Sequence, residues 1–444
     1  MPRLMPLMAS LLVATAFAQT PSQKPPVSPI KATARAERPD ATYKVGEKVT
    51  FNLAVTDKGK PAAGAVDWII VKDGLPTAMK GRAQLVDGKA SVQGSLDEPG
   101  FLQVRVLGYH AGAGQKPVSV TAMGGAAIDP LKIPASSPAP ADFDAFWAER
   151  KTELAKVPVA PVVTPVKSTL PEVDAFDLQA PCVGAPVSGY LAVPKGAAPK
   201  SLPIILTVHG AGVRGSSLGG AVGWASKGFL AMDINAHGLP NGRPESFYAE
   251  QTAGALKDYR YQGRDSREKS YFTGMFIRLV RAIDVLVARP EWNGKHVVVY
   301  GSSQGGYQAI VAAGLDHRVT FYAAGVSAGC DHTGMLANRI AGWPKFVAVD
   351  ASGKPDPASL ETSRYIDAAN FASRSKAAGC ALTVGFIDTT CPPTSVYAAY
   401  NLINIPKAMY DDIPSGHAQS KEASAFMQGA VMRHVGGSGS TGTR

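Results

Sequence analysis

The most informative stretch of the chain is His296-Val297-Val298-Val299-Tyr300-Gly301-Ser302-Ser303-Gln304-Gly305-Gly306. It begins with an apolar run typical of a buried strand, and the pattern G-x-S-x-G follows that run directly. A serine on such a strand-to-helix turn has a strained backbone, and glycines two residues before and after it prevent clashes. The stretch therefore predicts a nucleophile elbow with Ser303 as the nucleophile. The alternative is a glycine-rich turn in which Ser303 only caps a helix.

On both sides of this turn, strand patterns alternate with helical patterns. Strand patterns occupy 204–208, 229–234 and 297–300, and helical patterns occupy 275–289 and 307–315. This alternation predicts an α/β fold with a mostly parallel sheet. Further upstream, Asp142 precedes a helical pattern that includes Phe143, Phe146 and Trp147, and we expect it to cap that helix.

A serine nucleophile needs a histidine base and a carboxylate that fixes the tautomer of that histidine. Asp388 follows the buried-strand pattern 381–387, and His417 lies in a loop after the short strand 408–410. We predict Asp388 as the acid and His417 as the base. Two alternatives stay open. Asp331, which follows the strand pattern 321–327, could be the acid, and His332 could be the base. Asp388 and Asp331 could each also simply cap a loop.

The oxyanion of an acyl-transfer intermediate needs two backbone donors. Gln304, the residue after the nucleophile, is expected to supply one of them. The glycine-rich loop His209-Gly210-Ala211-Gly212 is expected to supply the other, from Ala211 or alternatively from Gly210. His209 is expected to hold this loop, and His237 either shapes the pocket or simply packs.

The N-terminal third consists of short apolar runs separated by turn residues. Strand patterns cover 49–55, 66–71 and 101–106, with turns at Asp73-Gly74 and Asp87-Gly88. This spacing predicts a small all-β, immunoglobulin-like sandwich over residues 30–125, followed by a catalytic domain over 126–435. The sandwich carries no catalytic cluster, so a structural or docking module is favoured over a sugar-binding one.

The first residues have the pattern of a signal peptide over 1–18. One arginine precedes an apolar stretch, and Ala16-Phe17-Ala18 precedes Gln19. The stretch is too short to anchor the chain in a membrane. We expect cleavage after Ala18, a linker over 19–29, a secreted or periplasmic protein, and a disordered tail over 436–444.

The composition restricts the remaining function classes. The chain has 444 residues, of which 18% are charged and 45% hydrophobic, with a net charge of +10, so we expect two or three folded units. Lysines and arginines are scattered among acidic residues, which argues against a nucleic-acid partner. The four cysteines fit neither a disulfide framework nor a metal site. No metal or other cofactor is expected, and a Cys330–Cys391 disulfide is a hypothesis because each cysteine follows an apolar strand.

Three motifs resemble those of the acetyl xylan esterase and cephalosporin C deacetylase family, the seventh carbohydrate esterase family. They are Asp142–Trp147, Gly301–Gly306 and Asp388–Asn401. The resemblance implies an α/β-hydrolase fold, removal of acetyl groups from xylan or xylo-oligosaccharides, and a Ser303, Asp388, His417 triad. Members without a leading β-domain tend to form closed oligomers, so a homo-oligomer is a hypothesis that the extra domain could block.

These observations together predict an exported serine carboxylester hydrolase that acts on acetylated carbohydrate, with neither a nucleic acid nor a membrane as partner. Two alternatives stay open. The first is a hydrolase with the same triad that acts on feruloyl or other acyl groups, or on peptides. The second is a noncatalytic carbohydrate-binding scaffold.

Overall fold

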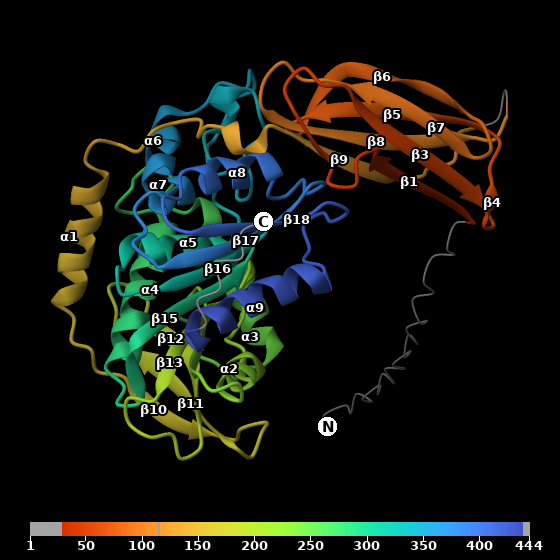
Figure 1. The fold of residues 1–444 in the computed structure, drawn as a ribbon. Helices are drawn as coiled ribbons and strands as arrows, with labels where there is room; N and C mark the ends of the chain where they lie inside the picture. The colour runs from red at the N-terminus through yellow and green to blue at the C-terminus, as the bar shows by residue number, and fades with distance from the viewer. Residues whose placement is uncertain (1–28, 113–115, 438–444) are drawn as a thin grey trace, which may run out of the picture.

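The structure, a computed structural model, describes residues 29–112 and 116–437 (Figure 1). The predicted signal peptide and all but the last residue of the predicted linker lie outside the described residues. The predicted disordered tail, residues 436–444, begins too early, because α9 (Lys421–Gly436) includes Gly436. Residues 438–444 are not described. Among the described residues, no helix is both long and apolar enough to cross a membrane.

The N-terminal part, which we call the β-domain, consists of two β-sheets that face each other (Figure 1). One sheet contains β1 (Ile30–Ala36), β3 (Val49–Asp57), β4 (Lys60–Pro61) and β7 (Lys89–Gly94). The other contains β2 (Thr42–Tyr43), β5 (Gly64–Lys72), β6 (Leu75–Leu85), β8 (Gly100–His110) and β9 (Ala122–Ile128). Phe51, Ile70 and Val104 from the two sheets share one buried core, which confirms the small all-β unit. Its exact boundary stays a prediction.

The pattern of side chains explains why these strands form. In β3, Val49, Phe51, Leu53 and Val55 are buried and alternate with more exposed residues, as expected for a strand with one face on a core. The predicted turn at Asp73-Gly74 joins β5 to β6, and both residues have positive φ angles, +48° and +85°. Asp-Gly pairs are favoured in two-residue hairpins because such turns require this backbone conformation.

The second part is built on a nine-stranded sheet with the order β10-β11-β12-β14-β13-β15-β16-β17-β18. From β14 to β18 in this order neighbouring strands are parallel, whereas β10 to β12 and the β12–β14 pair are antiparallel. The predicted mostly parallel sheet is confirmed. The strands are β10 (Val162–Val166), β11 (Val173–Ala180), β12 (Val187–Pro194), β13 (Leu202–Val208), β14 (Leu230–Ile234), β15 (Trp292–Ser302), β16 (Phe321–Gly325), β17 (Gly379–Gly385) and β18 (Lys407–Asp412).

Helices cover both faces of this sheet. Helices α2 and α9 pack on one face and share a core with it, whereas α1, α4 and α5 pack on the other (Figure 1). The helices besides α9 are α1 (Phe143–Ala155), α2 (Leu218–Ala225), α3 (Glu245–Ala253), α4 (Tyr271–Val287), α5 (Gln304–Leu315), α6 (Pro357–Ile366), α7 (Ala368–Ala372) and α8 (Pro393–Asn401), with short 3₁₀ turns η1 (Pro130–Lys132), η2 (Tyr259–Tyr261) and η3 (Gly334–Ala337).

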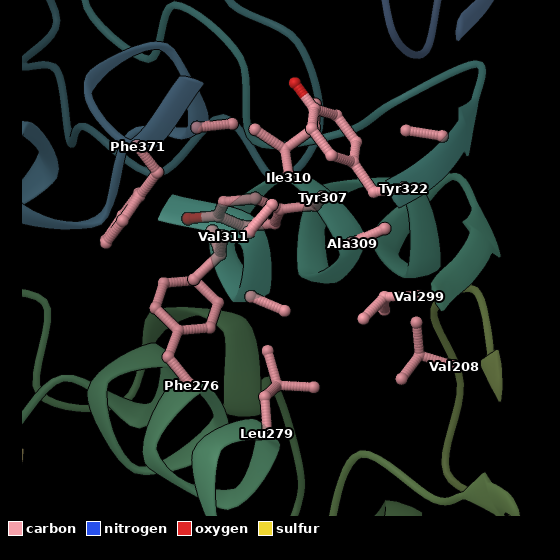
Figure 2. Close-up of a cluster of buried hydrophobic side chains, with 14 of the residues drawn as sticks. Val208, Phe276, Leu279, Val299, Tyr307, Ala309, Ile310, Val311, Tyr322 and Phe371 are labelled. Atoms are coloured by element: carbon pink, nitrogen blue, oxygen red, sulfur yellow. The ribbon is translucent and has the colours of Figure 1, made fainter. Parts of the chain in front are cut away.

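Helix α5 is enclosed by apolar side chains, which fixes the start of the helix relative to the sheet. Figure 2 shows Phe276 and Leu279 of α4 facing Val311 and Tyr307 of α5, with Val299 of β15 nearby. Nearly every residue of α5 is buried. A helix held on all sides in this way gives the turn that precedes it a rigid support.

One local prediction needs correction. Asp142 occupies the N-cap position of α1, but its side chain makes no bond to the helix amides. Its carboxylate instead accepts hydrogen bonds from Arg267 and Tyr365. A tertiary ion pair thus replaces the local capping bond that the sequence suggested.

Candidate active site

The turn between β15 and α5 has the backbone geometry expected of a nucleophile elbow. Ser303 has φ +58° and ψ −122°, a conformation that non-glycine residues rarely adopt. A Cβ added at Gly305 would lie 2.2 Å from the Val208 carbonyl oxygen, and one added at Gly301 would lie 2.5 Å from the carbonyl carbon of Gly305. Glycine is therefore required at both positions. The turn lifts the Ser303 side chain to the carboxyl edge of the parallel strands.

Three predicted residues are joined by hydrogen bonds at this edge. The Ser303 hydroxyl lies 2.9 Å from His417 Nε2, and His417 Nδ1 lies 2.8 Å from Asp388 Oδ2. Because a carboxylate only accepts, Nδ1 carries the proton and Nε2 is free to accept the serine proton. Asp388 is 1% exposed, and its second oxygen accepts from the Thr390 and Cys391 amides at 2.8 and 2.9 Å. The arrangement can deprotonate Ser303 and hold the resulting imidazolium.

The two alternative residues are engaged elsewhere. Asp331 Oδ2 accepts from Arg339 Nε at 2.8 Å, and its Oδ1 accepts from Ser136. His332 is fully buried, its Nε2 lies 3.3 Å from the Tyr307 hydroxyl, and burial lowers its pKa to about 3. Ser303 thus donates its hydrogen bond to His417 and not to His332.

The loop expected to supply an oxyanion donor lies beside the nucleophile. A Cβ added at Gly210 would lie 3.6 Å from Ser303 Cβ. His209 supports the loop, since its Nδ1 donates to Gly210 O at 2.6 Å and its Nε2 accepts from the Ala236 amide at 3.1 Å. Burial lowers the pKa of His209 to about 3, so the ring is neutral and fits this donor and acceptor pattern. Gln304 begins α5, where backbone amides have no acceptor within the helix.

Two tyrosines that the sequence did not indicate complete this region. The Tyr259 hydroxyl donates to Gln304 Oε1 at 2.6 Å, and burial raises the pKa of Tyr259 to about 12. The Tyr271 hydroxyl lies 2.6 Å from His237 Nδ1, and His237 Nε2 donates to Gly212 O at 3.1 Å. Burial lowers the pKa of His237 to about 4, so it is neutral and holds the glycine loop as a hydrogen-bond donor. Neither tyrosine lies in a recognisable motif, and only the fold brings them here.

The cysteines near the site are thiols. All four are free, so the hypothesised Cys330–Cys391 disulfide is wrong for this structure. Cys391 places its sulfur within 4.8 Å of ligand-type atoms of Asp388 and His417. Burial raises the pKa of the Cys391 thiol well above its usual value, which disfavours the thiolate that a metal would require. Asp388 and His417 are also occupied by their mutual hydrogen bond.

A family profile, a curated relative and a solved structure match this chain to acetyl esterases. The profile of the acetyl xylan esterase (AXE1) family matches residues 130–429. Acetyl esterase Axe7A of Xylanibacter ruminicola is 34% identical over 376 residues, which are 83% of this chain and 82% of that protein. The acetyl xylan esterase of Paenibacillus sp. R4 has a TM-score of 0.59 at 26% identity, covering 69% of this chain and 98% of its own.

A second solved structure supports the fold alone. Acetyl xylan esterase 1 of Thermoanaerobacterium sp. JW/SL YS485 has a TM-score of 0.56 at 21% identity, covering 67% of this chain and 96% of its own. Together with the sheet order and the helices on both faces, these neighbours confirm the predicted α/β-hydrolase fold after the β-domain.

Proposed function

The chain belongs to the acetyl xylan esterase family and is a carboxylic ester hydrolase, and on this premise we propose that it removes acetyl groups from xylan or xylo-oligosaccharides with a triad of Ser303, His417 and Asp388. The observation that carries the proposal is the hydrogen-bond chain from the Ser303 hydroxyl through His417 to the buried Asp388 carboxylate. A serine in that chain becomes a nucleophile when a carbonyl carbon approaches it.

The first half of the reaction forms an acetyl-enzyme. His417 Nε2 takes the Ser303 proton as Oγ attacks the acetyl carbonyl carbon, and Asp388 stabilises the imidazolium that results. The amides of Gln304 and Ala211 donate to the oxyanion of the tetrahedral intermediate. His417 then gives its proton to the sugar oxygen, the ester C–O bond breaks, and the deacetylated sugar leaves.

The second half releases acetate. Water enters, His417 takes one of its protons, and the hydroxide attacks the acetyl carbonyl carbon bound to Ser303 Oγ. The same two amides stabilise the second oxyanion. Collapse of this intermediate breaks the C–O bond to Ser303, His417 returns the proton to Oγ, and acetate departs. Each step reuses the same groups, so the mechanism needs no additional reactant besides water.

We also propose that the protein is exported, with cleavage after Ala18. This rests on the sequence of residues 1–18, namely one arginine, an apolar stretch and a small-x-small site. A polymeric plant substrate would lie outside the cell, so export agrees with the proposed substrate.

The test compares Ser303→Ala with Ser226→Ala, a matched change at the exposed C-cap of α2. Acetate release is measured from acetylated xylo-oligosaccharides and from p-nitrophenyl acetate. We expect Ser303→Ala to lose about a thousandfold or more on both substrates and Ser226→Ala to lose nothing. Full activity in Ser303→Ala would refute the triad. Activity of the wild type on the small ester alone would refute the substrate.

A further inference from the structure

The β-domain contacts the segment that carries Asp388. We define the acid loop as residues 386–394, which run from the end of β17 through the first two residues of α8. Gln103 of β8 is 3% exposed, and its Nε2 donates to the Phe386 carbonyl oxygen at 2.8 Å. The two residues are 283 positions apart in the chain. A buried side-chain amide of one domain therefore binds the backbone of the other, two residues before the proposed catalytic acid.

Apolar contacts surround this hydrogen bond. Phe101 lies edge-on to Phe386, with ring centroids 5.1 Å apart, and its ring is 5.6 Å from that of Tyr397 in α8. Phe101 belongs to the hydrophobic core of the catalytic domain although it is part of β8. On β9, a Cβ added at Gly125 would lie 2.7 Å from both Cβ and O of Phe386. The backbones of β9 and the acid loop are thus in direct contact.

The far end of the acid loop is held by the turn between β5 and β6. The Thr394 hydroxyl donates to Asp73 Oδ1, which also accepts from the Phe101 amide at 2.7 Å. The backbone oxygen of Asp73 accepts from the Ile340 amide at 3.1 Å. In Figure 1 this edge of the β-domain lies against α8. Both ends of the acid loop are consequently tied to the β-domain.

The backbone of the acid loop determines where the Asp388 carboxylate lies. Its Oδ1 accepts from the Thr390 and Cys391 amides, which are part of the same loop, and this orients Oδ2 toward His417. A shift of the loop would move donors and carboxylate together and would lengthen the bond to His417. Misplacement of a catalytic group by about 1 Å can cost roughly a hundredfold in rate.

We propose that the β-domain is a positioning element of the active site, in which Gln103, with Phe101 and Asp73, holds the acid loop so that Asp388 stays bonded to His417. The proposal rests on the proposed function. It assigns the β-domain a role in the active site although the β-domain carries no predicted catalytic side chain. Gln103 is a positioning residue, because it acts on Asp388 through the backbone of Phe386.

The central experiment compares Gln103→Leu with Gln93→Leu. Gln93 is exposed on β7, and its side-chain amide donates to Thr50 of the same domain. On p-nitrophenyl acetate we expect Gln103→Leu to lower kcat about tenfold with KM unchanged, since substrate contacts are untouched. The acid limb of the kcat/KM profile should move to lower pH, because a misplaced Asp388 stabilises the His417 imidazolium less. Gln93→Leu should change neither quantity.

A double-mutant cycle separates positioning from general damage. In an Asp388→Asn background, Gln103→Leu should reduce kcat by less than twofold, because the carboxylate whose position it controls is already absent. An equal tenfold loss in both backgrounds would overturn the proposal, as would a Gln103→Leu enzyme with wild-type kcat and pH profile. If Ser303→Ala retains activity, the triad itself fails, which is a different outcome.

Hydrogen exchange tests the same proposal without any activity. The Thr390 and Cys391 amides donate to Asp388, so their exchange reports on the acid loop directly. We expect both to exchange faster in Gln103→Leu than in the wild type and Gln93→Leu, while amides of α5 remain protected. Unchanged exchange at 390 and 391 in a folded Gln103→Leu protein would overturn the proposal.

Discussion

The acid loop and the loop that carries His417 are supported in opposite ways. The acid loop is packed against β8, β9 and the Asp73 turn, with hydrogen bonds at both ends. The histidine loop, residues 413–420 between β18 and α9, instead borders a cavity of about 580 Å³ at Ile413 and Pro414. The opposite wall of this cavity is formed by β1, β9 and the residues after β1.

The histidine loop is held mainly from within its own domain. Gln419 accepts from Ser302 Oγ at 2.6 Å and donates to Thr383 Oγ1 at 3.1 Å, while the Ser420 amide binds Asp412. The same β-domain is thus tightly packed on one loop and separated by open space from part of the other. This difference agrees with the proposed chemistry, because Asp388 must only keep its orientation whereas His417 exchanges protons with Ser303, the sugar oxygen and water.

The largest effect that distinguishes the two loops should appear in catalysis. His417→Ala removes the proposed base itself, whereas Asp388→Ala removes only the group proposed to orient that base and to stabilise its charge. We expect kcat on p-nitrophenyl acetate to fall by about 10⁴-fold or more in His417→Ala. The loss in Asp388→Ala should be roughly ten to a hundred times smaller than that loss. Circular dichroism controls for folding. A larger loss in Asp388→Ala would reverse this assignment of roles.

A smaller effect should appear in stability. Phe101 is 1% exposed and packs between Phe386 and Tyr397, so Phe101→Ala should lower the free energy of unfolding by about 3–5 kcal/mol. Ile413 is half-buried beside the cavity, and Ile413→Ala should cost about 1 kcal/mol. Urea unfolding followed by tryptophan fluorescence measures both. Equal losses would show that the two loops are supported equally well.

The smallest effect concerns pH. Burial raises the pKa of Asp73, so the folded protein binds that proton more tightly than the unfolded chain does. This group therefore makes the free energy of unfolding fall as pH rises from about 4 through the raised pKa, by at most about 1.4 kcal/mol per pH unit. Asp73→Asn should flatten this decline, whereas Asp97→Asn, at an exposed site, should not. Equal slopes in urea titrations of Asp73→Asn and the wild type would contradict the expectation.

The sequence predicts the candidate site residues but not the contacts that hold them in place. Ser303 and Asp388 were predictable because each follows a buried apolar strand, and parallel strands bring their carboxyl ends to one edge. The role of Gln103 as a contact between the domains could not be predicted. Gln103 alternates with apolar residues in β8, and this pattern assigns it to a face exposed to solvent. That face is covered by the other domain. Tyr259 and Tyr271 were missed for the same reason, since only tertiary packing places them near Gln304 and His237.

The span of 283 residues between Gln103 and Phe386 also imposes an order on biosynthesis. At roughly 5–20 residues per second, a ribosome needs about 15–60 s to add that span. During this time the β-domain can complete its own core, but the face with Phe101 and Gly125 has nothing to cover it. An uncovered apolar strand surface is prone to aggregation. The contact that joins the two domains can therefore form only after Phe386 has been synthesised, and until then this face of the β-domain stays uncovered.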